Sequence, residues 1–133
     1  MNIHVTDTHP LIWYVTNHHT KLSKKVLRLF DQAYNGQGLI YVPAIVFWGI
    51  SFLLKSGRVM LYQPFEQWAN YLLAIGGFDI APLDIEVIAE SLRLSFNNDP
   101  FDVAIVATAR IKDLPLITKD DDITSSQVVD IVW

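Results

Sequence analysis

Short apolar runs alternate with helical patterns along the chain, and this alternation constrains the fold more than any other feature. Five short runs bounded by turn-forming residues predict strands over 3–6, 39–42, 78–81, 114–118 and 127–132. Apolar residues at helical spacing predict helices over 8–16, 23–35, 43–56, 64–74, 84–94 and 100–112, with a loop or short turn over 119–123. Strands that alternate with helices are typical of an α/β sandwich with a mainly parallel sheet.

The composition is that of a folded protein with a large apolar core. The chain has 133 residues, 51% hydrophobic and 18% charged, and we expect residues 1–133 to form one domain. It has no cysteine, which excludes disulfides and thiolate zinc sites and is compatible with the cytoplasm. The start lacks a signal-peptide pattern, and the apolar stretch 39–54 is too short to span a membrane. We therefore expect a soluble cytoplasmic protein.

Acidic residues follow two of the predicted strands. Asp7 comes after the first strand and Asp120 after the strand at 114–118, and the carboxyl ends of parallel strands lie at one rim of a sheet. Asp102, early in the helix that begins at Pro100, can point into the same cleft. Carboxylates that lie close together repel one another unless a cation is present, and oxygen ligands of this kind select Mg²⁺ or Mn²⁺. Such an ion suits phosphodiester hydrolysis.

Each acid also has a structural explanation. Asp7 and Asp99 could cap helices, and Asp102 could complement a helix dipole. The acids at 120–122 could form a solvated turn, and an ion-pair network could imitate a metal site. Taken one at a time, these explanations compete evenly with the metal site. Because three acids are predicted at one rim, the metal site is favoured for the set as a whole.

The net charge of −4 is unusual for a protein that binds nucleic acid. A divalent ion at the acids would reverse the local sign of the charge. The cations fall into two groups, at 21–28 and at 55–58, which could equally be ordinary solvated helix faces.

Four segments together resemble the PIN-domain family, in particular VapC-type toxins of type II toxin–antitoxin systems. They are V-T-D-T-H at 5–9, Y-V-P-A at 41–44, D-P-F-D at 99–102 with the small-residue helix 104–109, and L-P-L-I-T-K-D at 114–120. They cover nearly the whole chain in the right order. The last two are the most specific.

The resemblance implies a PIN-like three-layer sandwich and a Mg²⁺- or Mn²⁺-dependent endoribonuclease. It also implies a homodimer and inhibition by a VapB-like antitoxin whose tail enters the site. Carried over by position, it makes Asp7, Asp102 and Asp120 metal-site acids. Asp99 matches a further site acid, and Thr8 and Thr118 match hydroxyl residues that support the site.

One position departs from the family pattern. The family has a glutamate on the helix after the second strand, in a motif like W-E-I, where this chain has Trp48-Gly49-Ile50. A glycine inside a helix costs roughly 1 kcal/mol relative to alanine, so helix stability does not explain Gly49. Either the chain is a naturally weakened member, or the glycine was introduced or selected because an active nuclease is toxic. In both cases we expect weak metal binding and poor RNA cleavage.

Two other functions are compatible with parts of the sequence. A non-catalytic PIN scaffold that binds an antitoxin or RNA would explain Gly49. A small phosphatase-like hydrolase would need a D-x-D motif, which the D-T-H at residues 7–9 does not supply.

The remaining aromatic and histidine side chains predict packing more than chemistry. We expect Trp13, Phe47, Trp48 and Trp68 to pack in the core or an interface rather than stack on bases. His9 is expected to be a packed or capping residue, and His18-His19 a solvated loop.

Overall fold

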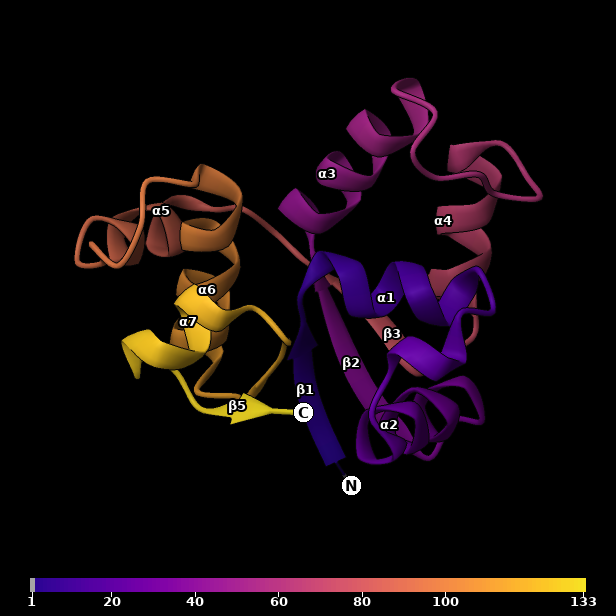
Figure 1. The fold of residues 1–133 in the computed structure, drawn as a ribbon, viewed down its shortest axis with the longest axis horizontal. Helices are drawn as coiled ribbons and strands as arrows, with labels where there is room; N and C mark the ends of the chain where they lie inside the picture. The colour runs from indigo at the N-terminus through magenta and orange to yellow at the C-terminus, as the bar shows by residue number, and fades with distance from the viewer. Residues whose placement is uncertain (1) are drawn as a thin grey trace.

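The computed structural model describes residues 2–133, in which five parallel strands form one sheet (Figure 1). The strands are β1 (Asn2–Thr6), β2 (Gly38–Pro43), β3 (Phe78–Ala81), β4 (Leu116–Ile117) and β5 (Ile131–Val132). Their order is β3-β2-β1-β4-β5, so β1 is central and pairs with β2 on one side and β4 on the other. The predicted α/β fold is confirmed, and its sheet is parallel throughout.

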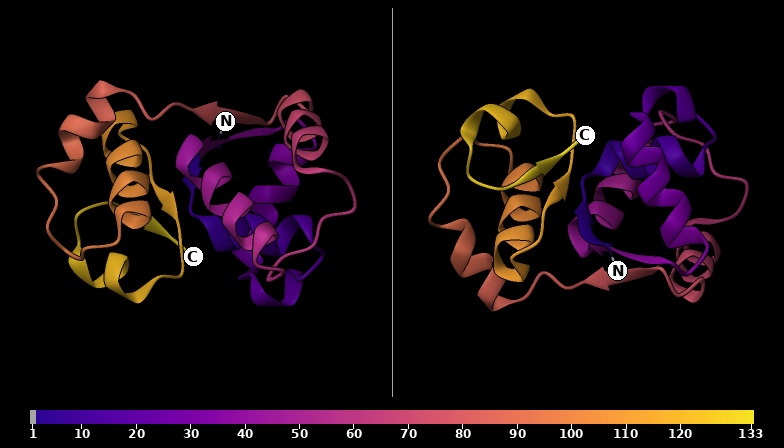
Figure 2. Two further views of the ribbon diagram at one scale, coloured as in Figure 1. Left: turned by 90° about the horizontal axis from the view of Figure 1, so that it is seen from above. Right: turned by 90° about the horizontal axis from the view of Figure 1, so that it is seen from below.

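Helices flank the sheet. They are α1 (Thr8–Val15), the 3₁₀ helix η1 (His19–Lys21), α2 (Lys24–Tyr34), α3 (Ala44–Lys55), α4 (Phe65–Ala74), α5 (Ile85–Ser91), α6 (Pro100–Lys112) and α7 (Asp121–Ser126). In Figure 1, α1 to α4 lie on one side of β1 and α5 to α7 on the other. Figure 2 shows that the segment through β3 joins these two groups. Within residues 2–133, no helix has the length and apolarity needed to cross a membrane.

Local sequence explains where the helices begin and what they bury. The side chain of Ser23 accepts a hydrogen bond from the Val26 amide at 3.1 Å, and Asp84 accepts one from Val87 at 3.0 Å. Such N-caps satisfy backbone donors that have no partner inside the helix. Helix α2 buries one stripe against β2, consisting of Val26, Leu29, Phe30 and Ala33. Together with the buried side chains of the sheet, stripes of this kind form the core.

Gly77 allows a close approach that the fold requires. A Cβ atom at this position would overlap the backbone of Ala33 at the end of α2. The Gly77 carbonyl accepts a hydrogen bond from the Ile40 amide at 2.9 Å, which starts the pairing of β3 with β2. Gly77 therefore allows β3 to pair with β2 close to the end of α2.

Several predicted boundaries were wrong. The predicted loop over 119–123 is interrupted by α7, which begins at Asp121 because the side chain of Asp120 caps it. The last two strands are shorter than predicted, since only 116–117 and 131–132 pair in the sheet. Helix α5 ends at Ser91 rather than near residue 94. The predicted loop at 18–19 leads into η1.

Candidate active site

Asp7 lies at the junction between the central strand and the first helix. β1 ends at Thr6 and α1 begins at Thr8, so the backbone turns at Asp7. Its Oδ1 accepts a hydrogen bond from the Thr8 amide at 2.7 Å, and its Oδ2 accepts one from the Thr118 hydroxyl at 2.7 Å. With 8% of its surface exposed, Asp7 is a buried carboxylate held in one orientation.

Burial raises the pKa of Asp7 above its usual value. The hydrogen bonds from Thr118 and Thr8, and the nearby His9, oppose this rise, while the negative charge of Asp120 adds to it. The contacts that favour the ionised form of Asp7 are therefore outweighed by its burial and by the charge of Asp120.

Thr118 joins the ends of two neighbouring strands. The pairing of Thr6 with Ile117 places Asp7 beside Thr118, which is fully buried. The Thr118 hydroxyl donates to Asp7 and accepts a hydrogen bond from the Asp120 amide at 3.0 Å. Asp120 in turn caps α7 by accepting from the Ile123 amide at 2.9 Å. One hydroxyl thus connects two of the predicted site acids.

Asp102 reaches the same rim from the first turn of α6. It is half-buried, and its pKa is raised to about 6, first by burial and then by the charges of Asp99, Asp120 and Asp7. A hydrogen bond from Asn97 Nδ2 at 3.1 Å opposes the rise. The charge interactions show that the structure brings Asp7, Asp102 and Asp120 within electrostatic range of one another.

Asp99 caps helix α6, which is one of the two roles that the sequence allowed for it. Its Oδ1 accepts from the amides of Phe101 at 2.8 Å and Asp102 at 3.3 Å, at the start of α6. The Asp99 amide is itself held by Asn97 Oδ1 at 3.0 Å. Asp99 is thus a helix cap, and its charge also acts on Asp102.

Gly49 lies beside two residues that adjoin predicted site acids in the sequence. A Cβ built at Gly49 would lie 3.4 Å from Cδ1 and Cε1 of Phe101 and 4.0 Å from Oγ1 of Thr8. Phe101 immediately precedes Asp102, and Thr8 immediately follows Asp7. The Phe101 ring borders Gly49, but these distances are ordinary contacts, so the site does not require a glycine for lack of space.

The carboxylate oxygens of the rim are suitable ligands for a hard divalent cation, but the acids are too far apart to form a closed site. Carboxylate oxygens are the ligands that Mg²⁺ and Mn²⁺ prefer, and a cation would offset both the burial and the neighbouring negative charges that raise the pKa values of Asp7 and Asp102. Within residues 2–133, however, no three His, Asp or Glu side chains are close enough together to hold a metal ion. Among the described residues, the acids of the rim therefore form an open set.

Asn97 is a site neighbour that the sequence did not single out. Its side chain holds both Asp99 and Asp102. Nothing in the local sequence signals the contact with Asp102.

The aromatic and histidine predictions were partly wrong. Phe47 and Trp68 are buried in the core, as predicted, and Trp13 is partly buried against it. Trp48 is 57% exposed and stacks on Phe101, so it lies outside the core, and its place in an interface stays a prediction. His9 is exposed and caps nothing, with its ring 5.8 Å from that of Trp13.

The sequence identifies the family. The profile described as PIN domain matches residues 5–127, so the chain belongs to the PIN domain family, and the resemblance noted from its motifs is confirmed. A search of curated protein sequences found no match.

Solved structures show the same fold at low sequence identity. VapBC2 from Rickettsia felis, bound to a DNA fragment from their promoter, is 14% identical with a TM-score of 0.66, over 98% of this chain and 97% of that one. DNA-bound VapBC from Salmonella typhimurium is 16% identical with a TM-score of 0.64, over 99% and 98%. FitAcB from Neisseria gonorrhoeae is 17% identical with a TM-score of 0.62, over 98% and 96%. The fold of this chain is therefore also found in toxin–antitoxin proteins.

Proposed function

We propose that this chain is a VapC-like endoribonuclease toxin that depends on Mg²⁺ or Mn²⁺ and is weakened by Gly49. The proposal is supported by three acids from separate elements of a PIN domain, Asp7, Asp102 and Asp120, which lie within electrostatic range of one another. PIN domains are generally nucleases, and an acidic rim of this kind suits phosphodiester hydrolysis.

The residues of the rim have separate roles in this proposal. Asp7, Asp102 and Asp120 hold the cation, which when bound supplies an activated water and stabilises charge on the phosphate. Thr118 and the Thr8 amide orient the Asp7 carboxylate. Because the pKa of Asp102 is about 6, a cation must compete with a proton there near neutral pH. We therefore expect metal affinity to rise with pH through this range.

The proposed partners are a VapB-like antitoxin and a second copy of the chain, in the cytoplasm. The toxin–antitoxin proteins that share the fold support the antitoxin. Exposed aromatic side chains on α3, Trp48 and Phe52, cluster with Phe101 and support a protein interface.

The test is cleavage of a labelled single-stranded RNA by the purified chain with Mn²⁺ or with EDTA, resolved on a denaturing gel. We expect slow internal cleavage that EDTA abolishes and that Asp7→Asn and Asp102→Asn remove. Absence of Mn²⁺-dependent cleavage, both in this chain and in Gly49→Glu, refutes the nuclease.

A non-catalytic PIN scaffold that binds RNA or an antitoxin is the second candidate. Gly49 and the lack of a closed metal-binding group within residues 2–133 favour it. It predicts binding without cleavage even when the acid at position 49 is restored.

A further inference from the structure

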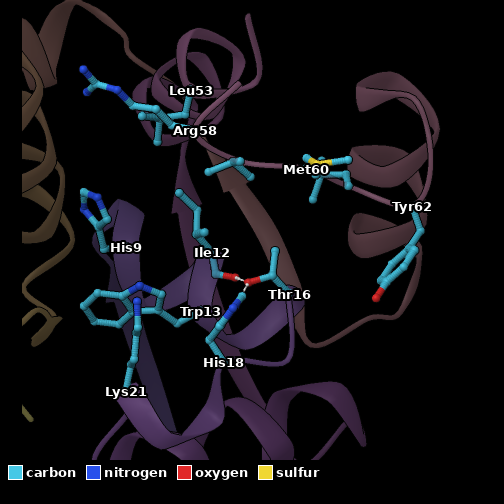
Figure 3. Close-up of a pocket in the computed structure, with 12 residues that line it drawn as sticks. His9, Ile12, Trp13, Thr16, His18, Lys21, Leu53, Arg58, Met60 and Tyr62 are labelled. Carbon is cyan, nitrogen blue, oxygen red and sulfur yellow. Dashed lines mark hydrogen bonds between the residues drawn. The ribbon is translucent and has the colours of Figure 1, made fainter. Parts of the chain in front are cut away.

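A second feature beside the acidic rim is a pocket of about 620 Å³ between α1 and the segment that follows α3 (Figure 3). We call it the α1 groove. Six of its lining residues carry the argument: His9, Trp13, His18, Lys21, Arg58 and Tyr62. In Figure 3 His9 and Trp13 come from α1, Lys21 lies below Trp13, and Arg58 lies above His9.

The α1 groove is a basic region of an acidic protein. None of its lining residues is Asp or Glu, although the chain carries a net charge of −4. Within residues 2–133, neither Lys21 nor Arg58 forms an ion pair with a carboxylate. Their charges are therefore available to an anionic ligand.

Basic and aromatic side chains alternate from the groove toward the acids. Lys21 Nζ lies 5.7 Å from the Trp13 ring, which meets the Trp133 ring edge-on at 6.3 Å. Lys119 Nζ lies 5.9 Å from the Trp133 ring, and Lys119 directly precedes Asp120.

The groove also adjoins the rim directly. A smaller pocket that contains Asp7 and Asp120 shares His9 and Trp13 with the α1 groove. A chain molecule lying in the groove can therefore continue to the acids.

Two hydrogen bonds in the groove orient the ring of His18. The Thr16 hydroxyl donates its proton to the Ile12 carbonyl oxygen at 2.6 Å, so it can only accept from His18 Nδ1, which lies 2.7 Å away (Figure 3). His18 Nδ1 is therefore the donor in this contact, and the bond holds the His18 ring in place in the lining of the groove.

We propose that the α1 groove binds the single-stranded RNA segment next to the phosphate at the acidic rim. Lys21 and Arg58 contact phosphates, while Trp13 and Tyr62 pack against the nucleosides. Cations interleaved with aromatic rings are the usual means of binding single strands without sequence preference. This inference rests on the proposed nuclease function. Two cations without an ion-pair partner, in a lining that has no acid, favour a polyanion such as RNA over a protein segment as the occupant.

The test is the affinity for a fluorescein-labelled single-stranded RNA of about 12 nucleotides, measured by anisotropy in EDTA over a range of salt concentrations. Lys21→Ala with Arg58→Ala removes the two groove cations. Lys24→Ala with Arg28→Ala is the matched control, because both residues are exposed on α2 and outside the groove. For single strands each phosphate contact contributes about 0.7 to the salt slope, so the groove pair should lower the slope by about 1.4. The control pair should leave it unchanged.

Tyr62→Ala tests the aromatic part without risk to the fold, because Tyr62 is 93% exposed. Loss of one stacked base should weaken RNA binding about five- to a hundredfold. Circular dichroism melts establish that each variant is folded.

Equal effects of the two pairs, or none from the groove pair, overturn the proposal. A groove that serves a protein instead of RNA also leaves RNA affinity unchanged in the groove pair. EDTA separates this test from the nuclease proposal, because binding is measured without cleavage. If the groove pair weakens RNA binding but neither this chain nor Gly49→Glu cleaves RNA with Mn²⁺, the nuclease proposal is refuted and the proposal of RNA binding in the groove still holds.

Discussion

Restoring an acid at position 49 tests the open rim most directly. The change is Gly49→Glu, with Gly49→Gln as a control of the same size and helix propensity. A Cβ at position 49 makes only ordinary contacts with Phe101 and Thr8. Both variants should therefore gain up to about 1 kcal/mol of helix stability over glycine.

The two variants should differ in their response to metal. If position 49 faces the rim, the added glutamate joins Asp7 and Asp102, whose pKa values are already raised, so in EDTA Gly49→Glu should be less stable than Gly49→Gln. With Mn²⁺ the extra ligand should tighten binding at least tenfold, or about 1.4 kcal/mol. At saturating Mn²⁺ this adds the same amount to the free energy of unfolding, or about 5 °C in Tm.

Calorimetry with Mn²⁺ and thermal unfolding with and without the ion measure both effects, and RNA cleavage should rise in parallel in the glutamate variant only. If the Glu and Gln variants bind Mn²⁺ equally, position 49 does not face the acids. The match of Gly49 to the family glutamate is then wrong, and so is our account of weakened activity.

Three further changes test the surroundings of the rim. The pKa of Asp102 is raised to about 6, so ionisation of this carboxyl lowers the stability of the metal-free fold as the pH rises from about 4 to about 6. In EDTA, Asp102→Asn should therefore have a higher Tm than the unchanged chain at about pH 7, but not at about pH 4. An equal difference in Tm at both pH values contradicts the raised pKa. Thr118→Val leaves a buried carboxylate and an amide without their partner, which should cost about 1–3 kcal/mol in urea unfolding. Thr108→Val, whose hydroxyl bonds only within its own helix, should cost less. Asp99→Ala should lose about 1 kcal/mol of cap stability and Asp99→Ser should recover it; a stable Ser variant that no longer cleaves RNA gives Asp99 a role in the site beyond capping.

The sequence could predict that Asp7 lies beside Thr118, because this neighbourhood depends on strand register. Asp7 and Thr118 each follow a strand, and adjacent parallel strands end together. It could not predict that Asn97 bonds Asp102, or that the Phe101 ring borders Gly49. Those contacts depend on how α3 and α6 pack, which no local pattern encodes.

The last helix shows why local propensity misled. The D-D-I-T-S-S of α7 consists mostly of residues that favour caps and turns over helix interiors, so a loop was the natural expectation. The helix forms because Asp120 caps it and Ile123 is fully buried in the core. Tertiary burial outweighed propensity over these six residues.

The separation of charge within the fold resolves the objection that a net charge of −4 raises against RNA binding. Electrostatic attraction acts over about one Debye length, roughly 8 Å at physiological salt, so the local charge matters more than the sum. The α1 groove has no acid in its lining, while Asp7, Asp102 and Asp120 gather at the adjoining rim. Without a cation that rim repels the very phosphate it is proposed to cleave, and the groove alone must hold the RNA. Metal binding and RNA binding should therefore support each other at the rim, whereas the contribution of Lys21 and Arg58 should persist when the metal is removed.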